Sequence, residues 1–483
     1  MLKTINNLFQ NLNTSNIAYC HWKSTNHLDA TVKGLTDLDM LFESSKANEI
    51  EKLIHELGFE RFDTVYLRAY PGIHDYVCLD ESGVWVHLHL HYMLNLGDRW
   101  VKAYLFPFEK EILSRVQYVE KYNTFVINSS DELLLHCLRM SLKYRSPFYQ
   151  KSILEELVFL KDKCTNFTPI NTELFEYFKS IPNIITYIFH NEKLNKRKLN
   201  SYSKGIVNEF TVFRRFGFWR FTYLSWKRKV YRYNIEFRRR YLKNFEIGRR
   251  KLVRGGKIIA LVGIDGSGKT STLDFIKRFF AIQMNVTNVF LGNGKSGASW
   301  YRKILFSIYG TKLKNKSDVE NINNFKPTKQ RNSVFYALWI LICLLDKEKN
   351  IKKAIAAKAN GSLVISDRWP QNQISGTFDG PRLNVENPKG FIKYVVDREQ
   401  KFLKLVSLVR PDLLIMLDVS PEIAMNRKPG ELTFHQAKTN TELLHKIDWP
   451  GSPSVIVNSN KPVEEVRKDV QFAIWSNISE LSI

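Results

Sequence analysis

A glycine-rich segment at residues 257–272, KIIALVGIDGSGKTST, constrains the fold of this chain more than any other feature. An apolar run at 258–262 predicts a strand, the pattern G-x-x-x-x-G-K-[ST] follows at 263–270, and an amphipathic run at 273–280 predicts a helix. In this order, backbone N–H groups of the loop and the N-terminus of the helix face phosphate oxygens. The sequence therefore predicts an α/β domain that binds a nucleoside triphosphate.

The residues of this loop have separate expected roles in binding ATP and Mg²⁺. Lys269 is expected to reach the β- and γ-phosphates, and the hydroxyl of Thr270 is expected to ligate Mg²⁺. The glycines allow the backbone to curl so that its N–H groups point at phosphate oxygens. The nucleotide-binding residues predicted from the motif are Gly263, Asp265, Gly266, Ser267, Gly268, Lys269, Thr270 and Ser271.

Length and composition indicate a multidomain cytoplasmic chain. At 483 residues with 44% apolar side chains the chain exceeds a single-core domain, so two or three domains are expected. Its five cysteines are scattered without a C-x-x-C pair, which is typical of a reduced compartment, and no signal peptide is recognised at the amino terminus. The longest apolar run, residues 334–345, is shorter than the about 20 residues of a spanning helix. It predicts a buried core helix or the interface of a homodimer.

Positive charge is concentrated in one basic aromatic segment. The chain has a formal net charge of +24, and residues 213–254 alone hold fifteen Lys or Arg, two Glu and twelve aromatic residues. Three interpretations remain open: an amphipathic helix on an anionic membrane surface, a strip that binds nucleic acid, or a connector whose aromatics pack against both domains. No specific nucleic-acid ligand is expected, because such a charge binds nucleic acid unspecifically. A peripheral position at the inner face of the membrane stays an alternative.

Three further segments follow the glycine loop in a definite order. An apolar strand at 363–366 ends in Asp367-Arg368-Trp369, and a second strand lies in RPDLLIMLD at 410–418. A third strand, SVIVN at 454–458, leads into a helix. Because ligands bind at the carboxyl ends of strands in open α/β sheets, the residues at these strand ends are candidate site residues.

Together these segments resemble the thymidylate kinase family of nucleoside monophosphate kinases over residues 255–483. The resemblance implies an ATP- and Mg²⁺-dependent phosphotransferase with a parallel sheet flanked by helices. It also implies that Lys269 and Arg368 are catalytic, Arg368 by holding the phosphate of the acceptor, and that Asp367 approaches the Mg²⁺ through water. The alternative interpretation of Asp367 and Arg368 is an ordinary ion pair at a strand end.

The resemblance assigns roles to other polar residues as well. Arg427 or Lys428 would close as a lid over the transferring phosphoryl group, with a solvated helix end as the alternative interpretation. Asp265 would contact a hydroxyl of the substrate, because a carboxylate beside phosphates is electrostatically unfavourable. Asn458 and Asn460 could border the adenine or lie in a polar loop.

The sequence constrains the identity of the phosphoryl acceptor less than it constrains the type of reaction. Thymidylate kinases carry an Arg-Glu-Pro-Gly-Gly type motif after the second strand, whereas this chain has GNGKSGASW at 292–300. That segment can hold an anion through Lys295 and glycine N–H groups, but it does not reproduce the thymidine-reading pattern. Residues 310–331 are interpreted as an insertion. The expected acceptor is a nucleoside monophosphate or a sugar-type small molecule.

The amino-terminal part carries Asp37-Leu-Asp39 on a predicted strand. The two carboxylates share one face of the strand, an arrangement that suits divalent metal ions. With the segments around it, the pattern resembles nucleotidyltransferases of the DNA polymerase β-like superfamily over residues 15–145. The resemblance implies an α+β fold and a metal site at Asp37 and Asp39.

A third acid would be expected on a later strand of such a domain. The best-matching strand has histidines there, His87, His89 and His91 on one face, which could ligate Zn²⁺ or Mn²⁺ or form a neutral polar face. Asp75 or Asp80 could supply the missing acid.

The sequence therefore predicts three segments: a nucleotidyltransferase-like α+β domain at 1–195, a basic helical connector at 196–254 and a kinase domain at 255–483. The expected function is transfer of the γ-phosphoryl group of ATP to a small acceptor. Two alternatives remain: a nucleotidyltransferase–kinase fusion in surface-polysaccharide precursor synthesis, and a non-enzymatic NTP-dependent switch.

Overall fold

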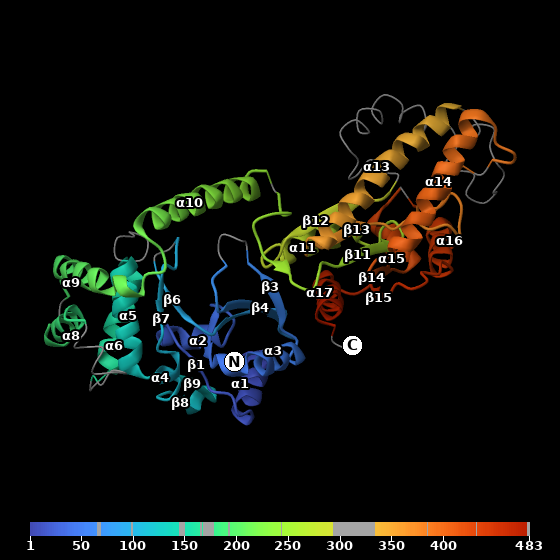
Figure 1. The fold of residues 1–483 in the computed structure, drawn as a ribbon. Helices are drawn as coiled ribbons and strands as arrows, with labels where there is room; N and C mark the ends of the chain where they lie inside the picture. Colours follow the sequence, from blue (N-terminus) through green and yellow to red (C-terminus); the bar gives the residue numbers. More distant parts are fainter. Residues whose placement is uncertain are drawn as a thin grey trace. The chain divides into compact units, whose positions relative to one another are not determined.

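The computed structural model describes residues 1–64, 69–97, 100–143, 150–164, 167, 178–191, 194–242, 244–292, 334–383, 385–430 and 432–480. The chain divides into two compact units, Met1–Lys243 and Asn244–Ile483 (Figure 1). Residues 196–242 of the expected connector thus belong to the amino-terminal unit. The candidate anion segment with Lys295 and Gly297, and the expected insertion at 310–331, lie outside the described residues.

The amino-terminal unit is an α+β structure. Its helices are α1 (Lys3–Thr14), α2 (Leu28–Thr31), α3 (Ala47–Glu56), α4 (Glu109–Leu113), α5 (Ser129–Lys143), α6 (Gln150–Lys163), α8 (Ser180–His190), α9 (Lys196–Glu209) and α10 (Phe218–Arg240). Its strands are β1 (Tyr19–His21), β2 (Leu38–Phe42), β3 (Glu60–Asp63), β4 (Ile73–Leu79), β5 (Trp85–His91), β6 (Leu94–Leu96), β7 (Tyr104–Phe106), β8 (Gln117–Val119) and β9 (Thr124–Val126).

Seven strands of this unit lie in a mixed sheet in the order β3-β4-β5-β2-β1-β9-β8, while β6 and β7 pair with each other in a separate two-stranded sheet. Strands β2 and β5 are parallel, whereas β4 and β5 are antiparallel, so β5 lies between the two strands that carry the acidic residues. In one core, apolar residues of α1 and α3 pack against side chains of the sheet, such as Met40 and Leu88. A second core joins Cys20 and Leu41 to α5, α6, α8 and α9. Both faces of the sheet are therefore covered.

The start of α5 lies earlier than its sequence suggests. Ser129 and Ser130 have the side chains of helix caps and precede Asp131, but the helix already includes both serines. The side chain of Asn128 instead accepts a hydrogen bond of 2.9 Å from the backbone N–H of Ser130. An Asn oxygen is as good a cap as a Ser hydroxyl, so the helix begins earlier.

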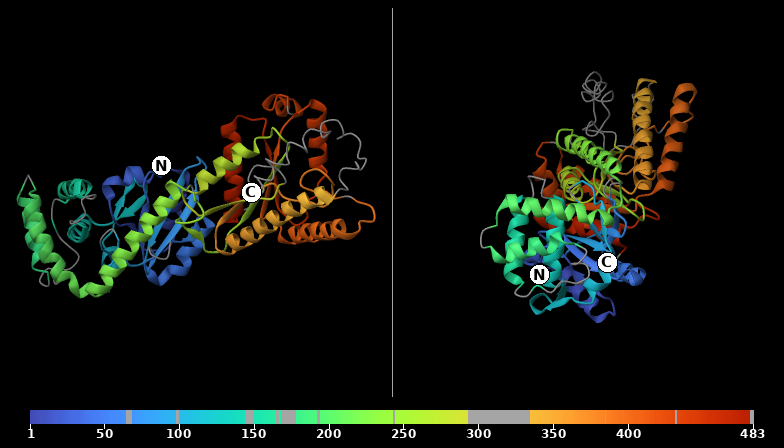
Figure 2. Two further views of the ribbon diagram at one scale, coloured as in Figure 1. Left: turned by 90° about the horizontal axis from the view of Figure 1, so that it is seen from above. Right: turned by 60° about the vertical axis from the view of Figure 1, so that its left-hand side comes forward.

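The basic aromatic segment is mostly one long helix, α10, seen in Figures 1 and 2. Only Ser225 and Ile235 of this helix are buried. Arg228 donates hydrogen bonds to the Tyr70 hydroxyl at 2.8 Å and to the Trp100 carbonyl at 2.7 Å, which hold the helix on its own unit. Several large apolar side chains stay exposed: Phe218, Trp219, Tyr223, Trp226, Tyr233 and Phe237.

The carboxy-terminal unit contains a parallel sheet flanked by helices. Its helices are α11 (Lys269–Phe280), α13 (Val334–Ala359), α14 (Gly390–Val409), α15 (Pro421–Arg427), α16 (Phe434–His445) and α17 (Val463–Ser479). Its strands are β10 (Lys251–Leu252), β11 (Ile258–Gly263), β12 (Val286–Phe290), β13 (Leu363–Asp367), β14 (Leu413–Asp418) and β15 (Ser454–Asn458).

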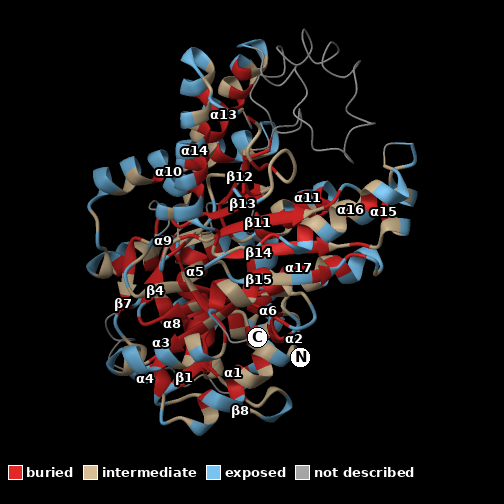
Figure 3. Ribbon diagram, turned by 90° about the vertical axis from the view of Figure 1, so that its right-hand side faces the viewer, coloured by how far each residue is buried: buried red, intermediate tan, exposed pale blue. Residues whose placement is uncertain are grey.

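Five of these strands pair in parallel in the order β12-β13-β11-β14-β15, which places β11 at the centre. Central parallel strands are covered on both faces and therefore consist of continuous apolar residues. The sequences IIALV and LLIML fit this rule, and Figure 3 shows β11, β13 and β14 buried. The carboxyl ends of all five strands meet at one edge of the sheet.

The apolar run at 334–345 forms the start of α13, which packs beside α14. Only one side of the run is buried, including Ile340 and Leu344, while Phe335 is 82% exposed. The predicted core helix is therefore buried on one side only, and the alternative, an interface of a homodimer, stays a prediction. Among the described helices, none has the length and apolarity that crossing a membrane requires.

Candidate active site

The glycine loop between β11 and α11 has the geometry of a phosphate-binding loop. Gly266 and Gly268 have φ angles of +85° and +90°, in the left-handed region that glycine adopts without strain. A Cβ atom at Gly266 would lie 2.5 Å from the carbonyl oxygen of Ala424, so no larger residue fits there. The exposed Thr270 lies in the first turn of α11, where the helix dipole favours anions.

The side chain of Lys269 bends back into the loop. Its ammonium donates hydrogen bonds to the carbonyl oxygens of Gly263 at 2.9 Å and Ile264 at 2.7 Å. Burial lowers the pKa of Lys269 to about 8, and the positive charge of Arg368 adds to this effect. Bound phosphate oxygens would relieve this unfavourable charge, because an adjacent anion favours the charged form of a lysine.

Asp367 ends β13, next to the central strand, with its Cα opposite Leu261 of β11. One carboxylate oxygen of Asp367 is buried and has no hydrogen-bond partner among the described residues. Burial raises the pKa of this carboxyl group, against the effect of Arg368 and Lys269. An orphaned carboxylate oxygen at the phosphate loop fits a role in the hydration shell of Mg²⁺.

Arg368 follows with a φ of +73°, which is unusual for a residue other than glycine. Its guanidinium lies 3.8 Å from Asp265 of the loop and 3.5 Å from the buried Asp379. Burial opposes the charge on Arg368, but Asp379, Asp265 and Asp367 together raise its pKa. This strained, charged residue is held at the strand end where an acceptor would lie.

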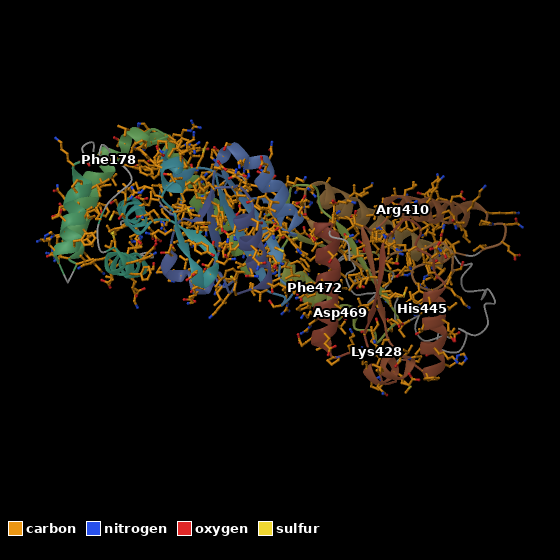
Figure 4. The ribbon with its side chains drawn as sticks, turned by 90° about the horizontal axis from the view of Figure 1, so that it is seen from below. Phe178, Arg410, Lys428, His445, Asp469 and Phe472 are labelled. Carbon is orange, nitrogen blue, oxygen red and sulfur yellow. The ribbon has the colours of Figure 1, made fainter. Side chains whose placement is uncertain are left out.

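Arg427, at the end of α15, contacts the same loop. Its guanidinium donates to the carbonyl oxygens of Gly266 at 3.4 Å and Ser459 at 3.0 Å. Lys428, labelled with His445 in Figure 4, comes directly after the helix. The exposed Arg427 therefore contacts the phosphate loop and the turn after β15, and its role as a lid residue stays a prediction.

The turn after β15 also touches the phosphate loop. Ser459 donates a hydrogen bond of 2.6 Å to the carbonyl oxygen of Ser267, and Asn460 accepts one of 2.8 Å from the backbone of Ser420. Sequence reasoning singled out Asn458 and Asn460 but missed Ser459 between them. The only sequence feature that could have indicated Ser459 is its position at the end of a predicted strand.

A pocket opens beside the loop and Arg368. Its wall is formed by Val262, Gly263, Arg368, Trp369, Phe378, Asp379, Leu444 and Trp449. The indole N–H of Trp449, one of the lining residues, is buried without a partner among the described residues. Sequence reasoning missed Phe378, Asp379 and Trp449, which come from loops without a recognisable motif.

The predicted metal residues of the amino-terminal unit lie together with all three histidines. Asp39 is 2.7 Å from Lys23 and 3.0 Å from Nδ1 of His89. Although burial favours its protonated form, Lys23 and the histidines hold the pKa of Asp39 well below its usual range. Asp75 joins this cluster, 2.9 Å from His87.

Asp80, the other candidate for a third acid, lies elsewhere. It accepts hydrogen bonds of 2.9 Å from the backbone N–H of Thr4 and 2.6 Å from the hydroxyl of Ser82. Asp80 therefore stabilises a turn and the start of α1.

A central parallel strand, a phosphate-binding loop after it and an Asp-Arg pair at the adjacent strand end define a P-loop kinase-like region. Within this class, the chain is 30% identical over 226 residues to the uncharacterized ATP-binding protein YghR of Escherichia coli, which covers 45% of this chain and 86% of YghR. The chain belongs to the family of this ATP-binding protein. No protein-family model matches it.

Other relatives are kinases. The chain is 28% identical over 236 residues to a probable thymidylate kinase of Methanosarcina mazei, covering 47% of this chain and 99% of that kinase. A solved structure of deoxyadenosine kinase from M. mycoides, with dCMP and dCDP bound, aligns at 16% identity and a TM-score of 0.28. That alignment covers 45% of this chain and 99% of the kinase. The two relatives found by sequence, YghR and the probable thymidylate kinase, support ATP use and a nucleotide kinase-type phosphotransferase region.

Proposed function

We propose that the carboxy-terminal unit transfers the γ-phosphoryl group of ATP to a nucleoside monophosphate. The observation that carries this proposal is that the phosphate loop and the pocket beside it share lining residues. Gly263 of the phosphate loop and Arg368 both line the aromatic pocket, and Arg368 also lies 3.8 Å from Asp265 of the loop. A molecule in the pocket would therefore face the terminal phosphate of the bound ATP.

The chain supplies positive groups on several sides of the transferring phosphoryl group. Lys269 would bind the β- and γ-phosphate oxygens, Arg368 would hold the acceptor phosphate, and Arg427 would close over the loop. Such fixed charges stabilise the negative charge that spreads over the phosphoryl oxygens in the transition state. The binding geometry also removes the entropic cost of bringing donor and acceptor together.

Mg²⁺ would be held by the hydroxyl of Thr270 and, through water, by Asp367. The buried unpartnered oxygen of Asp367 and the exposed hydroxyl of Thr270 fit a hard cation that prefers oxygen ligands. Bound there, the ion would neutralise phosphate charge.

The pocket wall favours a nucleotide as acceptor. Trp369, Phe378 and Trp449 contribute aromatic side chains to the pocket wall, against which a base would pack. Arg368 supplies a planar guanidinium for phosphate.

The test measures transfer of label from γ-labelled ATP to a panel of acceptors: dTMP, other nucleoside monophosphates, sugars and sugar phosphates. We expect labelled nucleoside diphosphate with the wild-type chain and none with Lys269→Ala. Replacement of the exposed Lys401 on α14 by alanine is the matched control and should leave the rate unchanged. Labelling of a sugar-type acceptor alone would overturn the proposed acceptor, and no acceptor-dependent turnover would overturn the kinase.

For the amino-terminal unit we propose a nucleotidyltransferase-like fold. This proposal is supported by the mixed sheet and by a third carboxylate, Asp75, next to the pair formed by Asp37 and Asp39. Pyrophosphate release from a nucleoside triphosphate, lost in Asp39→Asn and kept in Lys269→Ala, would support nucleotidyl transfer. Pyrophosphate release that persists in Asp39→Asn would contradict it.

A further inference from the structure

Three histidines of β5 meet Asp39 of β2, Asp75 of β4 and Asp37, which directly precedes β2. The register pairs Asp39 of β2 with His89 of β5, and pairs His89 with Asp75 of β4. His87 and His91 lie two residues to either side of His89, on the same face of β5. The pairing of the strands therefore places imidazoles between carboxylates from both neighbouring strands.

Asp75 contacts the Nε2 atoms of two different imidazoles. Its Oδ1 lies 2.9 Å from Nε2 of His87 and 3.0 Å from Nε2 of His89. Because a carboxylate is an acceptor, it favours a proton on each Nε2. Metal-binding histidines are commonly held in this way by a carboxylate behind the ring. With both Nε2 atoms turned toward the buried Asp75, the Nδ1 atoms face the other side, where that of His87 meets Asp37 and that of His89 lies 3.0 Å from Asp39.

Asp37 lies on that other side. Its Oδ1 is 2.8 Å from Nδ1 of His87, and its Oδ2 is 3.9 Å from Nδ1 of His89. The side chain of Asp37 is 52% exposed, so an ion can reach it from solvent. One ligand atom each of Asp37, His87 and His89 lies within 4.8 Å of the others, close enough to share one ion.

A second triad, Asp39, His89 and His91, has the same spacing but a different charge environment. The ammonium of Lys23 lies 2.7 Å from Oδ1 of Asp39 and already neutralises that carboxylate. A divalent cation at the same oxygen would be repelled by the ammonium. Asp37 instead contacts two imidazoles, those of His87 and His89.

We propose that Asp37, His87 and His89 bind one divalent transition-metal ion, with Asp75 as the carboxylate that orients both imidazoles. Two nitrogen ligands and one oxygen ligand suit borderline metals such as Zn²⁺, whereas Mg²⁺ prefers oxygen ligands only. Three protein ligands leave a coordination position for water or a substrate oxygen, facing solvent beside the exposed Asp37. This site is separate from the Mg²⁺ of the phosphate loop and does not rest on the proposed kinase function.

The test is calorimetric titration of the untagged full chain, stripped of metal and free of nucleotide, with Zn²⁺, Mn²⁺ and Mg²⁺. We expect one Zn²⁺ per chain, bound at least about 100-fold more tightly than Mg²⁺. His87→Gln, His89→Gln and Asp37→Asn should each abolish this binding. Asp75→Asn should keep the stoichiometry and weaken the affinity about 10- to 100-fold, because it removes only the orienting carboxylate.

Two controls identify the ligands. His74 lies on β4 beside Asp75 but pairs with Glu51 at 2.9 Å, so His74→Gln should bind Zn²⁺ as the wild type does. His91→Gln should also retain binding, because His91 belongs to the other triad. Loss of binding in His91→Gln with retention in Asp37→Asn would overturn the assignment. Equal affinity for Mg²⁺ and Zn²⁺, or no bound metal, would overturn the site itself.

A spectroscopic measurement does not depend on the folding of the variants. Co²⁺ added to the metal-free wild type should give the intense visible absorption of a four-coordinate ion and should be displaced by one equivalent of Zn²⁺. The weak spectrum of a six-coordinate ion would contradict the proposed ligand set.

Discussion

The hydroxyl of Ser459 donates a hydrogen bond of 2.6 Å to the carbonyl oxygen of Ser267, although 192 residues separate the two positions. Both residues are buried, so the bond fixes the turn after β15 against the phosphate loop. Arg427 binds the carbonyl oxygens of Ser459 and Gly266 and adds a second connection. The loop conformation therefore depends on segments far along the chain as well as on its own glycines.

Removal of this hydrogen bond should weaken ATP binding. Ser459→Ala leaves the buried carbonyl oxygen of Ser267 without its partner, which costs about 1–3 kcal/mol. We expect a lower melting temperature and a several-fold higher Kd for ATP, measured by calorimetry. Ser407→Ala is the control, because the hydroxyl of the exposed Ser407 donates its hydrogen bond to the nearby Lys404 carbonyl at 2.8 Å. Equal effects of the two substitutions would contradict a role for Ser459 in holding the loop.

Gly266→Ala should abolish ATP binding. Its Cβ would lie 2.5 Å from the carbonyl oxygen of Ala424, and the φ of +85° adds backbone strain of about 1–3 kcal/mol. Gly390→Ala is the matched control: its φ is +56°, but no atom lies within 4 Å of the added Cβ. We expect Gly390→Ala to bind ATP normally in the same titration. Unchanged ATP binding in Gly266→Ala would show that the loop has a different conformation.

The buried His21 should make the amino-terminal unit less stable in acid. Burial lowers the pKa of His21 from 6.5 to about 4; Asp39 opposes this effect, while Lys23 and Lys163 add to it. Between these values the unfolded chain binds a proton that the folded chain does not, so stability is present above pH 6.5 and falls as the pH approaches 4. The loss is roughly 3 kcal/mol.

Urea unfolding at a series of pH values measures this effect. We expect His21→Leu to have a smaller pH dependence than the wild type in this window. The same pH dependence in both proteins would show that His21 does not contribute.

We propose that α10 binds anionic membranes through its exposed aromatic and basic side chains. Trp219 and Trp226 are 83% and 61% exposed, and aromatic rings of this kind partition into the interface of a bilayer. Vesicles that contain phosphatidylserine should therefore bind the full chain, and Trp219→Ala with Trp226→Ala should reduce binding severalfold. Retention of the wild-type affinity in the double variant, with sensitivity to salt alone, would indicate unspecific attraction of positive charge.

Much of the fold of the carboxy-terminal unit can be predicted from local sequence patterns. The segments IIALV, LVIS and LLIML are continuous apolar strands because they lie inside a parallel sheet, and the glycine pattern fixes the loop between strand and helix. Arg368 could be singled out because it directly follows a predicted strand. Ser459, Asp379 and Trp449 could not, because their roles depend on contacts between segments distant in sequence.

The cluster of histidines and aspartates in the amino-terminal unit was likewise only partly predictable from local sequence. The alternation along WVHLHLH predicts that its histidines share one face, since strand side chains alternate. The choice between Asp75 and Asp80 required the antiparallel register of β4 and β5, which sets Asp75 opposite His89. No local pattern encodes that register.

The most direct test of the kinase account is the steady-state kinetics of Arg368→Ala with the preferred acceptor. If Arg368 holds the acceptor phosphate, kcat/KM for the acceptor should fall at least about 100-fold. The Kd for ATP should change little, because Lys269 and the glycine loop bind that nucleotide. Wild-type acceptor kinetics in Arg368→Ala would contradict the account, since no other described guanidinium lines the pocket.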